Sequence, residues 1–361
     1  MIYLDNTQSI LSSYLNNTEK IMNHLLESKP FCGIARILTN LDLGFPHDVV
    51  RLAGGFATGI CVSWQSEIPF IPIDICMNVC TVSLYELGDY VDLKEEEFKK
   101  LTKNLNASSY ISNFHRGNHF ISLLEDIYTS KYYIMIHSSA AEFETLYNGL
   151  YPVEGNFFHS NINYYHDEGR YVRYLSGKSA ELFYRLIKNA YEYNQNRHDF
   201  IINSLLGNVN LIVNCKHYHH YGMPDSNIAL LGSHIIGRGQ ETPLLTREGE
   251  NVYLIKYHDI KEKKLQLFDN KKLFITPHGL GKQHCRDFKI YIDEKKKYLQ
   301  LDSLQYKIKY GESLREHPGL RIRTLDMKDY FKKLSSLYSY SILSEFKQII
   351  SYNKNGFIRW K

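Results

Sequence analysis

Histidines beside strand-like segments are the residues of this chain best suited to chemistry. His119 follows a glycine-containing turn, and His137 closes an apolar run over 132–136. Imidazoles held by rigid elements can converge on one metal ion, since each offers a nitrogen lone pair near neutral pH. The chain has 16 histidines in 361 residues, so ordinary core or turn roles are the simpler interpretation of this pair taken alone.

A carboxylate and two thiols lie in one short segment upstream of these histidines. Asp74, Cys76 and Cys80 fall within 72–80, where a β-rich run meets its turn. Oxygen and sulfur ligands so placed suit a transition ion that imidazoles complete. The alternative is a buried structural thiol beside a capping aspartate.

Two later segments also join a strand to histidines. An apolar strand over 209–213 leads into 214–220, which we predict to be a turn carrying His217, His219 and His220. A strand over 273–276 leads into His278 and the glycines at 279 and 281. Glycines there would let the backbone approach a phosphate, and His278 could act as a base or nucleophile.

The remaining pattern predicts strands in the middle of the chain and helices around them. Helical spacing of apolar residues occurs over 10–26, 179–206 and 331–346, and 92–103 reads as an exposed, salt-bridged helix. Short β-rich runs fill 31–90, and 319–328 reads as a late strand. The histidines and thiols are spread from 74 to 278, which favours one intertwined domain.

Composition sets few limits on function. The chain has 43 Lys+Arg, 39 Asp+Glu and a net charge of +4, which permits nucleic acid as a partner without requiring it. Six scattered cysteines favour a reducing compartment. No signal peptide or run of 18 apolar residues is present, so we expect a cytoplasmic protein that does not enter a membrane. A basic rim for nucleic-acid phosphates could include Lys216, Arg238, Arg247, Lys282 and Arg286, and scattered surface charge is the alternative interpretation.

The order of the motifs resembles that of the RtcB family of RNA-splicing ligases. The similar segments run in register from about residue 35 to 330. They are Asp74-Ile-Cys, Gly117-Asn118-His119-Phe120, Ile136-His137-Ser138, 213–217, His278-Gly279-x-Gly281 and 323–328. The resemblance divides the chain into an N-terminal helical segment (1–34), a ligase domain (35–330) and a C-terminal helical extension (331–361). It implies an α+β fold with central β-sheets, peripheral helices and a metal site in a central cleft.

The same resemblance implies an enzyme. It would be a GTP-dependent ligase with two manganese ions that joins an RNA 3′-phosphate or 2′,3′-cyclic phosphate to a 5′-hydroxyl, in RNA repair or tRNA splicing. A protein activator is a further partner that the resemblance allows. His278 would carry the covalent GMP, Asn118 would contact the nucleotide and Lys328 its base. The metal ligands would be Asp74, Cys76, His119, His137 and His217.

Two questions stay open at this point. The family's cysteine lies three residues after the aspartate, where this chain has Met77, so either Cys76 or Cys80 would take that role. The function also has alternatives: a metal-binding protein or RNA-end binding module without catalysis, or a guanylyltransferase that acts on another acceptor.

Overall fold

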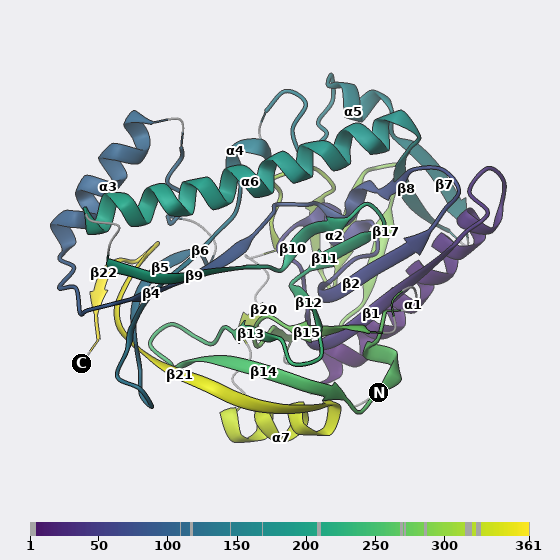
Figure 1. Cartoon of the computed structure of the whole chain (residues 1–361). Coiled ribbons are helices and arrows are strands. Elements are labelled where there is room, and N and C mark those ends of the chain that lie inside the picture. The colour runs from purple at the N-terminus through teal and green to yellow at the C-terminus, as the bar shows by residue number, and fades with distance from the viewer. Residues whose placement is uncertain are drawn as a thin grey trace.

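A curled, eight-stranded antiparallel sheet forms the centre of the computed structural model (Figure 1). The structure describes residues 5–108, 110–115, 118–144, 146–167, 169–207, 211–267, 270, 272–284, 287–314, 320–322 and 326–360.

The strand order of this sheet brings the middle of the chain and its last segment together. Seven strands follow one another in the order β13 (Glu241–Leu244), β14 (Val252–Ile260), β21 (Tyr338–Asn353), β5 (Phe120–Asp126), β6 (Tyr132–Ser138), β4 (Thr81–Leu87) and β9 (Ile212–His219). The eighth strand, β22 (Gly356–Arg359), pairs with β21. Every pairing among these strands is antiparallel.

One face of the sheet is covered by the long helix α6 (Lys178–Leu206), with α3 (Glu95–Ala107) at its C-terminal end (Figure 1). Ile201, Ile202 and Leu205 of α6 pack on Ile134 and Ile136 in a buried cluster. Gly207 ends α6 in the left-handed conformation, which costs glycine least. The helices predicted over 179–206 and near 92–103 are therefore confirmed.

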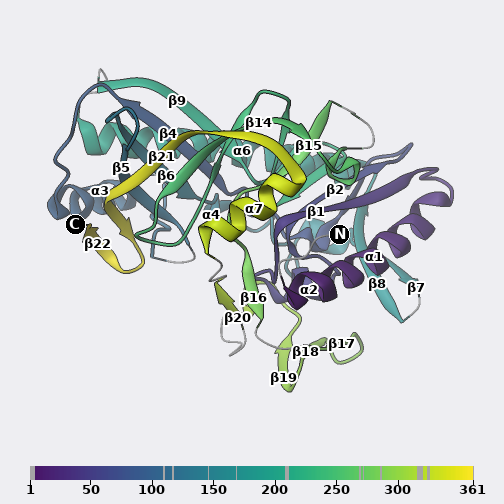
Figure 2. The same cartoon turned by 90° about the horizontal axis from the view of Figure 1, so that it is seen from below.

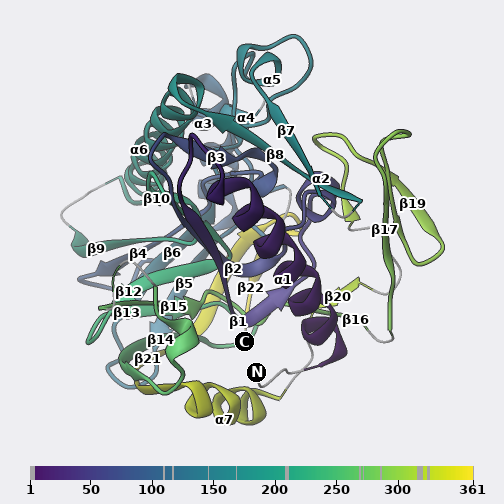
Figure 3. The ribbon, with the colours of Figure 1, turned by 90° about the vertical axis from the view of Figure 1, so that its right-hand side faces the viewer.

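A second sheet and the opening helix form the neighbouring half of the molecule. This sheet has the order β1 (Ile34–Gly44), β2 (Thr58–Gln65), β11 (Ile228–Leu231) and β10 (Tyr221–Asp225). Helix α1 (Asn6–Glu27) packs along β1, as Figure 3 shows, with Leu11, Leu15 and Met22 buried. Asp5 caps α1 by accepting from the backbone N–H of Gln8.

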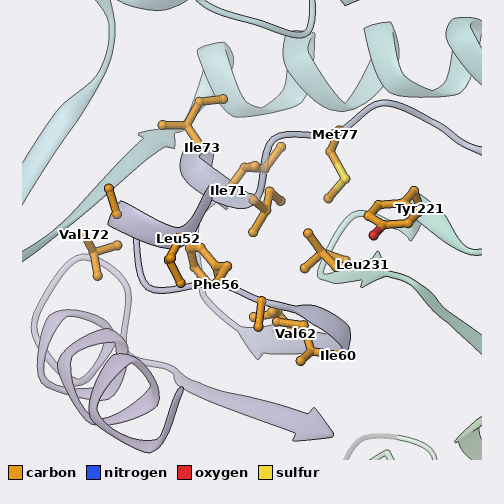
Figure 4. Close-up of a cluster of buried hydrophobic side chains, with 14 of the residues drawn as sticks. Leu52, Phe56, Ile60, Val62, Ile71, Ile73, Met77, Val172, Tyr221 and Leu231 are labelled. Carbon is orange, nitrogen blue, oxygen red and sulfur yellow. The ribbon is translucent and has the colours of Figure 1, made fainter. Parts of the chain in front are cut away.

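The largest apolar core lies between this second sheet, α1 and α6 (Figure 4). It includes Phe56, Ile60, Val62, Met77 and Leu231. The short helix α2 (Val49–Ala53) and the single turn η1 (Ile73–Ile75) are buried in it. The β-rich runs predicted within 31–90 are present as strands β1, β2 and β4.

Smaller sheets complete the fold. They are β3 (Phe70–Pro72) with β8 (Arg170–Ser176) and β7 (Asn163–Asp167), β12 (Ser233–Gly237) with β15 (Leu273–Pro277), β16 (Lys282–His284) with β20 (Leu320–Ile322), and the meander of β17 (Ile290–Asp293), β18 (Tyr298–Leu301) and β19 (Leu304–Lys307). The meander projects from the body of the molecule (Figure 2). Short helices are α4 (Ala141–Glu144), α5 (Phe157–Ser160) and η3 (Lys263–Leu265).

The C-terminal segment differs from the helix expected over 331–346. Helix α7 spans Met327–Leu337 and ends there, and the chain continues as the 16-residue strand β21. Phe346 and Ile350 lie buried within the sheet, where β21 pairs with β14 on one side and β5 on the other. The 331–361 segment is thus helical only at its beginning.

The coarse fold prediction is confirmed: the structure is a mixture of helices and strands around a central sheet. Within the described ranges, no helix is both long and apolar enough to cross a bilayer.

Candidate metal centre and histidine pair

Three buried side chains bring potential metal ligands together at one end of the large sheet. Cys80 Sγ lies 3.0 Å from His137 Nε2, which lies 3.1 Å from His220 Nε2. The three ligand atoms all lie within 4.8 Å of one another. His119 joins this group, since its Nε2 is 3.7 Å from Cys80 Sγ. We call Cys80, His119, His137 and His220 the buried cluster.

Strand register explains why these residues meet. Cys80 immediately precedes β4, His119 precedes β5, His137 is the next-to-last residue of β6 and His220 follows β9. The strands are neighbours in the order β5, β6, β4 and β9, and the pairs Phe120–His137, Thr81–Ser138 and Thr81–His219 lie opposite one another. All four residues therefore lie at the same end of these strands.

Backbone carbonyls orient two of the imidazoles. His137 Nδ1 lies 3.0 Å from the carbonyl oxygen of Asn118, and His119 Nδ1 lies 3.1 Å from that of Asn113. A carbonyl can only accept, so each Nδ1 donates its hydrogen and each Nε2 keeps its lone pair. Both lone pairs then lie on the side of Cys80, an arrangement typical of histidines that bind metals.

The protonation of the buried cluster also suits a cation. Burial, followed by the neighbouring imidazoles, lowers the pKa of His137 and His220 well below its usual range, so both rings are neutral ligands at pH 7. Burial raises the pKa of the Cys80 thiol, and a bound cation would favour the thiolate instead. One thiol and several neutral imidazoles make a donor set that fits a divalent transition ion.

His278 lies beside the buried cluster and is held by a carboxylate. Its Nδ1 donates to Asp42 Oδ2, with the carbonyl of Gly232 3.2 Å away as a second acceptor. Asp42 belongs to β1 and is 1% exposed, and its Oδ1 has no hydrogen-bond partner among the described residues. Nδ1 is therefore the protonated nitrogen of His278, and Nε2 keeps the lone pair that a nucleophile or base needs.

The His278 ring is stacked on the His220 ring. Their centroids are 4.5 Å apart and their planes differ by 13°. A further ring, His234, lies 5.7 Å from His220 and has its Nδ1 3.0 Å from the carbonyl oxygen of His219. The histidine–carboxylate pair and the buried cluster are thus one continuous site.

Packing against Asp42 explains the glycine at position 281, in the turn after His278. Gly281 has a φ of +68°, and a Cβ there would lie 2.7 Å from the backbone oxygen of Asp42. The turn can therefore close over Asp42 only with glycine at this position. That these glycines contact a phosphate stays a prediction.

The structure does not bring Asp74 or Cys76 to the buried cluster. Asp74 accepts a bidentate pair of hydrogen bonds from Arg173, with Nε 3.0 Å from both carboxylate oxygens. Cys76 is buried, and its carbonyl accepts from Arg51. Burial raises the pKa of both the Asp74 carboxyl and the Cys76 thiol. Cys80, the alternative thiol of this segment, is the one that contacts His137.

His217 lies on the opposite face of the sheet from His137. The segment predicted as a turn over 214–220 is mostly strand β9, along which successive side chains alternate between faces. His217 Nδ1 contacts Ser83 Oγ beneath α6 at 2.7 Å. His220, three residues later, points to the other face and reaches the buried cluster. It therefore takes the place expected for His217.

The two predicted nucleotide contacts, Asn118 and Lys328, have exposed side chains. The Asn118 side chain is exposed, and its backbone carbonyl is the group that contacts His137. Lys328 is exposed in the first turn of α7, two residues before Tyr330, whose hydroxyl donates to the Gly279 carbonyl at 3.3 Å. Gly117 and 323–325, which belong to the predicted motifs, lie outside the described residues.

The predicted basic rim is largely neutralised where it is described. Lys216 pairs with Glu241, Arg238 with Asp259 at 3.0 Å, and Arg247 with Glu250 at 2.6 Å. Arg286 and the side chain of Lys282 lie outside the described residues.

Comparison with known proteins adds no identification. No protein-family model matches the chain, and no curated protein matches it.

Proposed function

We propose that this chain is a metal-dependent nucleotidyltransferase of the RNA-ligase type, which joins an RNA 3′-phosphate to a 5′-hydroxyl by way of GMP bound to His278. The observation that carries the proposal is the pairing of His278 with Asp42 beside a cluster of metal ligands. The motif order that resembles the RtcB ligases supports the choice of GTP and RNA.

The chemistry assigned to His278 follows from its hydrogen bonds. Its Nε2 would attack the α-phosphorus of GTP, forming an N–P bond while the bond to pyrophosphate breaks. Positive charge would then develop on the ring, and the Asp42 carboxylate at Nδ1 would stabilise it. Asp42 is thus proposed as a positioning residue that both fixes the tautomer and offsets the charge.

The later steps return His278 to its starting state. An oxygen of the RNA 3′-phosphate would attack the phosphorus of the GMP and release the imidazole. The 5′-hydroxyl would then attack the activated 3′-phosphate, forming the phosphodiester and expelling GMP. A 2′,3′-cyclic phosphate would first be opened by water to a 3′-phosphate.

The buried cluster would hold the manganese ions predicted from sequence. Cys80, His137 and His220 would form one ligand set, and His119 lies on the other side of the same sulfur. When bound, the cations would neutralise charge on the phosphates. Asn118 would act through its backbone carbonyl, which keeps His137 Nε2 available.

Guanylyl transfer to an acceptor other than RNA is the second candidate. It is favoured because Lys216, Arg238 and Arg247, the described side chains of the predicted basic rim, already pair with carboxylates. Such pairing lowers the charge available to attract an RNA backbone. His278 and the buried cluster would serve both reactions in the same way.

Guanylylation tests the proposal directly. The purified protein would be incubated with Mn²⁺ and GTP labelled at the α-phosphate, and the acid-labile adduct would be mapped by mass spectrometry. We expect GMP on His278, no adduct in His278→Ala, and nearly normal metal content in that variant. An adduct-free wild type across several metals and with RNA present would refute nucleotidyl transfer and leave a non-catalytic metal-binding or RNA-end binding module. An adduct without joining of 3′-phosphate and 5′-hydroxyl RNA ends would favour another acceptor.

A further inference from the structure

A second group of potential ligands lies on the face of the sheet that α6 covers. Asp199, Cys215 and His217 offer one oxygen, one sulfur and one nitrogen, all within 4.8 Å of one another. Cys215 Sγ is 3.6 Å from His217 Nε2. Asp199 is exposed and the other two are half-buried, so an ion can reach them from solvent.

Two secondary structure elements hold this group. Cys215 and His217 are two residues apart on β9, so their side chains share one face. β9 is the last strand of the large sheet, with β4 as its neighbour. Asp199 belongs to α6, and Tyr85 of β4 donates its hydroxyl hydrogen to Asp199 Oδ1 at 2.8 Å. The group therefore links the helix to the edge strand.

Hydrogen-bond direction beneath α6 can be worked out from Ser138. Its Oγ accepts from Arg197 at 2.8 Å and donates to Asn194 Oδ1 at 3.3 Å, because a guanidinium only donates and an amide oxygen only accepts. When the one hydrogen of Ser138 goes to Asn194, the contact of 2.5 Å with His198 Nε2 is a donation by His198. With the hydrogen of the neutral ring on Nε2, His198 Nδ1 keeps its lone pair and accepts.

The same reasoning reaches His217 through Ser83. Ser83 Oγ lies 2.6 Å from His198 Nδ1, to which it donates its hydrogen. The contact of 2.7 Å between Ser83 Oγ and His217 Nδ1 is then a donation by His217. This assignment satisfies every contact in the chain, whereas the reverse direction leaves the contact of Ser138 with Asn194 without a hydrogen. His217 Nε2 therefore keeps its lone pair, directed toward Cys215 and Asp199.

We propose that Asp199, Cys215 and His217 form a second divalent-cation site, of the zinc type, separate from the buried cluster. A thiolate, an imidazole and a carboxylate are the ligands that zinc takes, and three protein ligands leave a fourth position for water or a solvent ligand. His217 donates from Nδ1 to Ser83 Oγ, the kind of hydrogen bond that the second ring nitrogen of a metal-bound histidine usually makes. The ion joins α6 to β9, the strand that leads to His220. The proposal does not depend on the proposed function.

The test separates this site from the buried cluster. Chelator-treated protein would be titrated with Zn²⁺ alone in a Cys80→Ser, His137→Gln background, with binding followed by calorimetry. We expect one remaining site, whose affinity falls at least about 10-fold in Cys215→Ser and in His217→Gln. The matched control is Cys32→Ser, which removes an exposed thiol elsewhere and should leave binding unchanged. Absence of the remaining site, or equal affinity in the Cys215 and Cys32 variants, would overturn the proposal.

A second measurement avoids changes to the buried cluster. Co²⁺ bound to the otherwise unaltered chain gives a thiolate-to-cobalt absorption band for each cysteine ligand. Cys215→Ser should remove about half of this band when both sites are loaded, while Cys32→Ser should keep it whole. A band that disappears only with Cys80→Ser would show that Cys215 binds no metal. Ser83→Ala should weaken the second site by about 10-fold without removing its band at saturation.

Discussion

Replacing Asp42 with asparagine tests how the site prepares His278. The carboxylate now accepts from His278 Nδ1, whereas the side-chain amide introduced by Asp42→Asn could donate to Nδ1 and place the ring hydrogen on Nε2 instead. A histidine with Nε2 protonated has no lone pair there to attack phosphorus. Side-chain volume hardly changes, so packing beneath Gly281 should persist.

The expected loss can be bounded from the structure. A hydrogen bond to a charged group contributes about 1.5–3 kcal/mol, which corresponds to a decrease of about 10- to 150-fold in rate. Forcing the wrong tautomer on a catalytic histidine can cost about 10⁴-fold, as in serine proteases. The Gly232 carbonyl, 3.2 Å from Nδ1, still favours the productive tautomer, so we expect a decrease between about 10²- and 10³-fold.

The assay is the rate of GMP adduct formation under single-turnover conditions with Mn²⁺. Metal content and the urea unfolding midpoint would be measured in parallel, because the buried cluster lies next to His278 but does not include Asp42. Guanylylation of Asp42→Asn at the wild-type rate would refute the role of this carboxylate. Loss of metal together with activity would instead mean that Asp42 supports the cluster.

Three further predictions concern metal, stability and pH. Cys80→Ser should lose metal from the buried cluster while Cys76→Ser keeps it, as measured by elemental analysis after dialysis; equal content in both variants would remove Cys80 from the ligand set. Asp74→Asn should lower the free energy of unfolding by about 3–5 kcal/mol, because the partly buried Arg173 loses the charge of the buried Asp74 carboxylate, and a change below about 1 kcal/mol in urea unfolding would contradict this. Burial, followed by the neighbouring His278, lowers the pKa of His234 to about 3 in the folded state. The unfolded chain therefore binds its proton first as pH falls below about 6.5, and this group alone should cost about 2 kcal/mol of stability between pH 7 and 5. The comparison of wild type with His234→Phe in chelator should reveal that difference, and parallel pH profiles would exclude it.

The sequence pointed to the histidines of the site that lie beside strands. It did not point to the side chain that pairs with His278. His119, His137 and His278 stand beside clear apolar runs, and the structure brings all three to one site. Asp42 carried no such indication, because it precedes His278 by 236 residues and meets it only through the packing of β1 against the turn after β15. A contact of this kind depends on tertiary structure and leaves no local pattern.

The choice among His217, His219 and His220 depended on one local assignment. A turn over 214–220 gives no rule for which ring points inward, whereas a strand places alternate residues on opposite faces. In the structure, exposed Asn214 and Lys216 alternate with half-buried Cys215 and His217, as a strand requires. The same applies to the helix expected over 331–346, which rested on apolar residues three and four apart, whereas in the structure buried Phe346, Gln348 and Ile350 alternate as in a strand.

The position of β21 has a consequence for how the chain is made. β21 lies between β14 and β5, so the strands β13 and β14 connect to the rest of the large sheet only through residues 338–353. During synthesis the edges of β5 and β14 therefore emerge long before the strand that pairs with both of them. Unpaired edges of this kind are where chains associate wrongly, so the incomplete sheet is open to aggregation until residues 338–353 have left the ribosome.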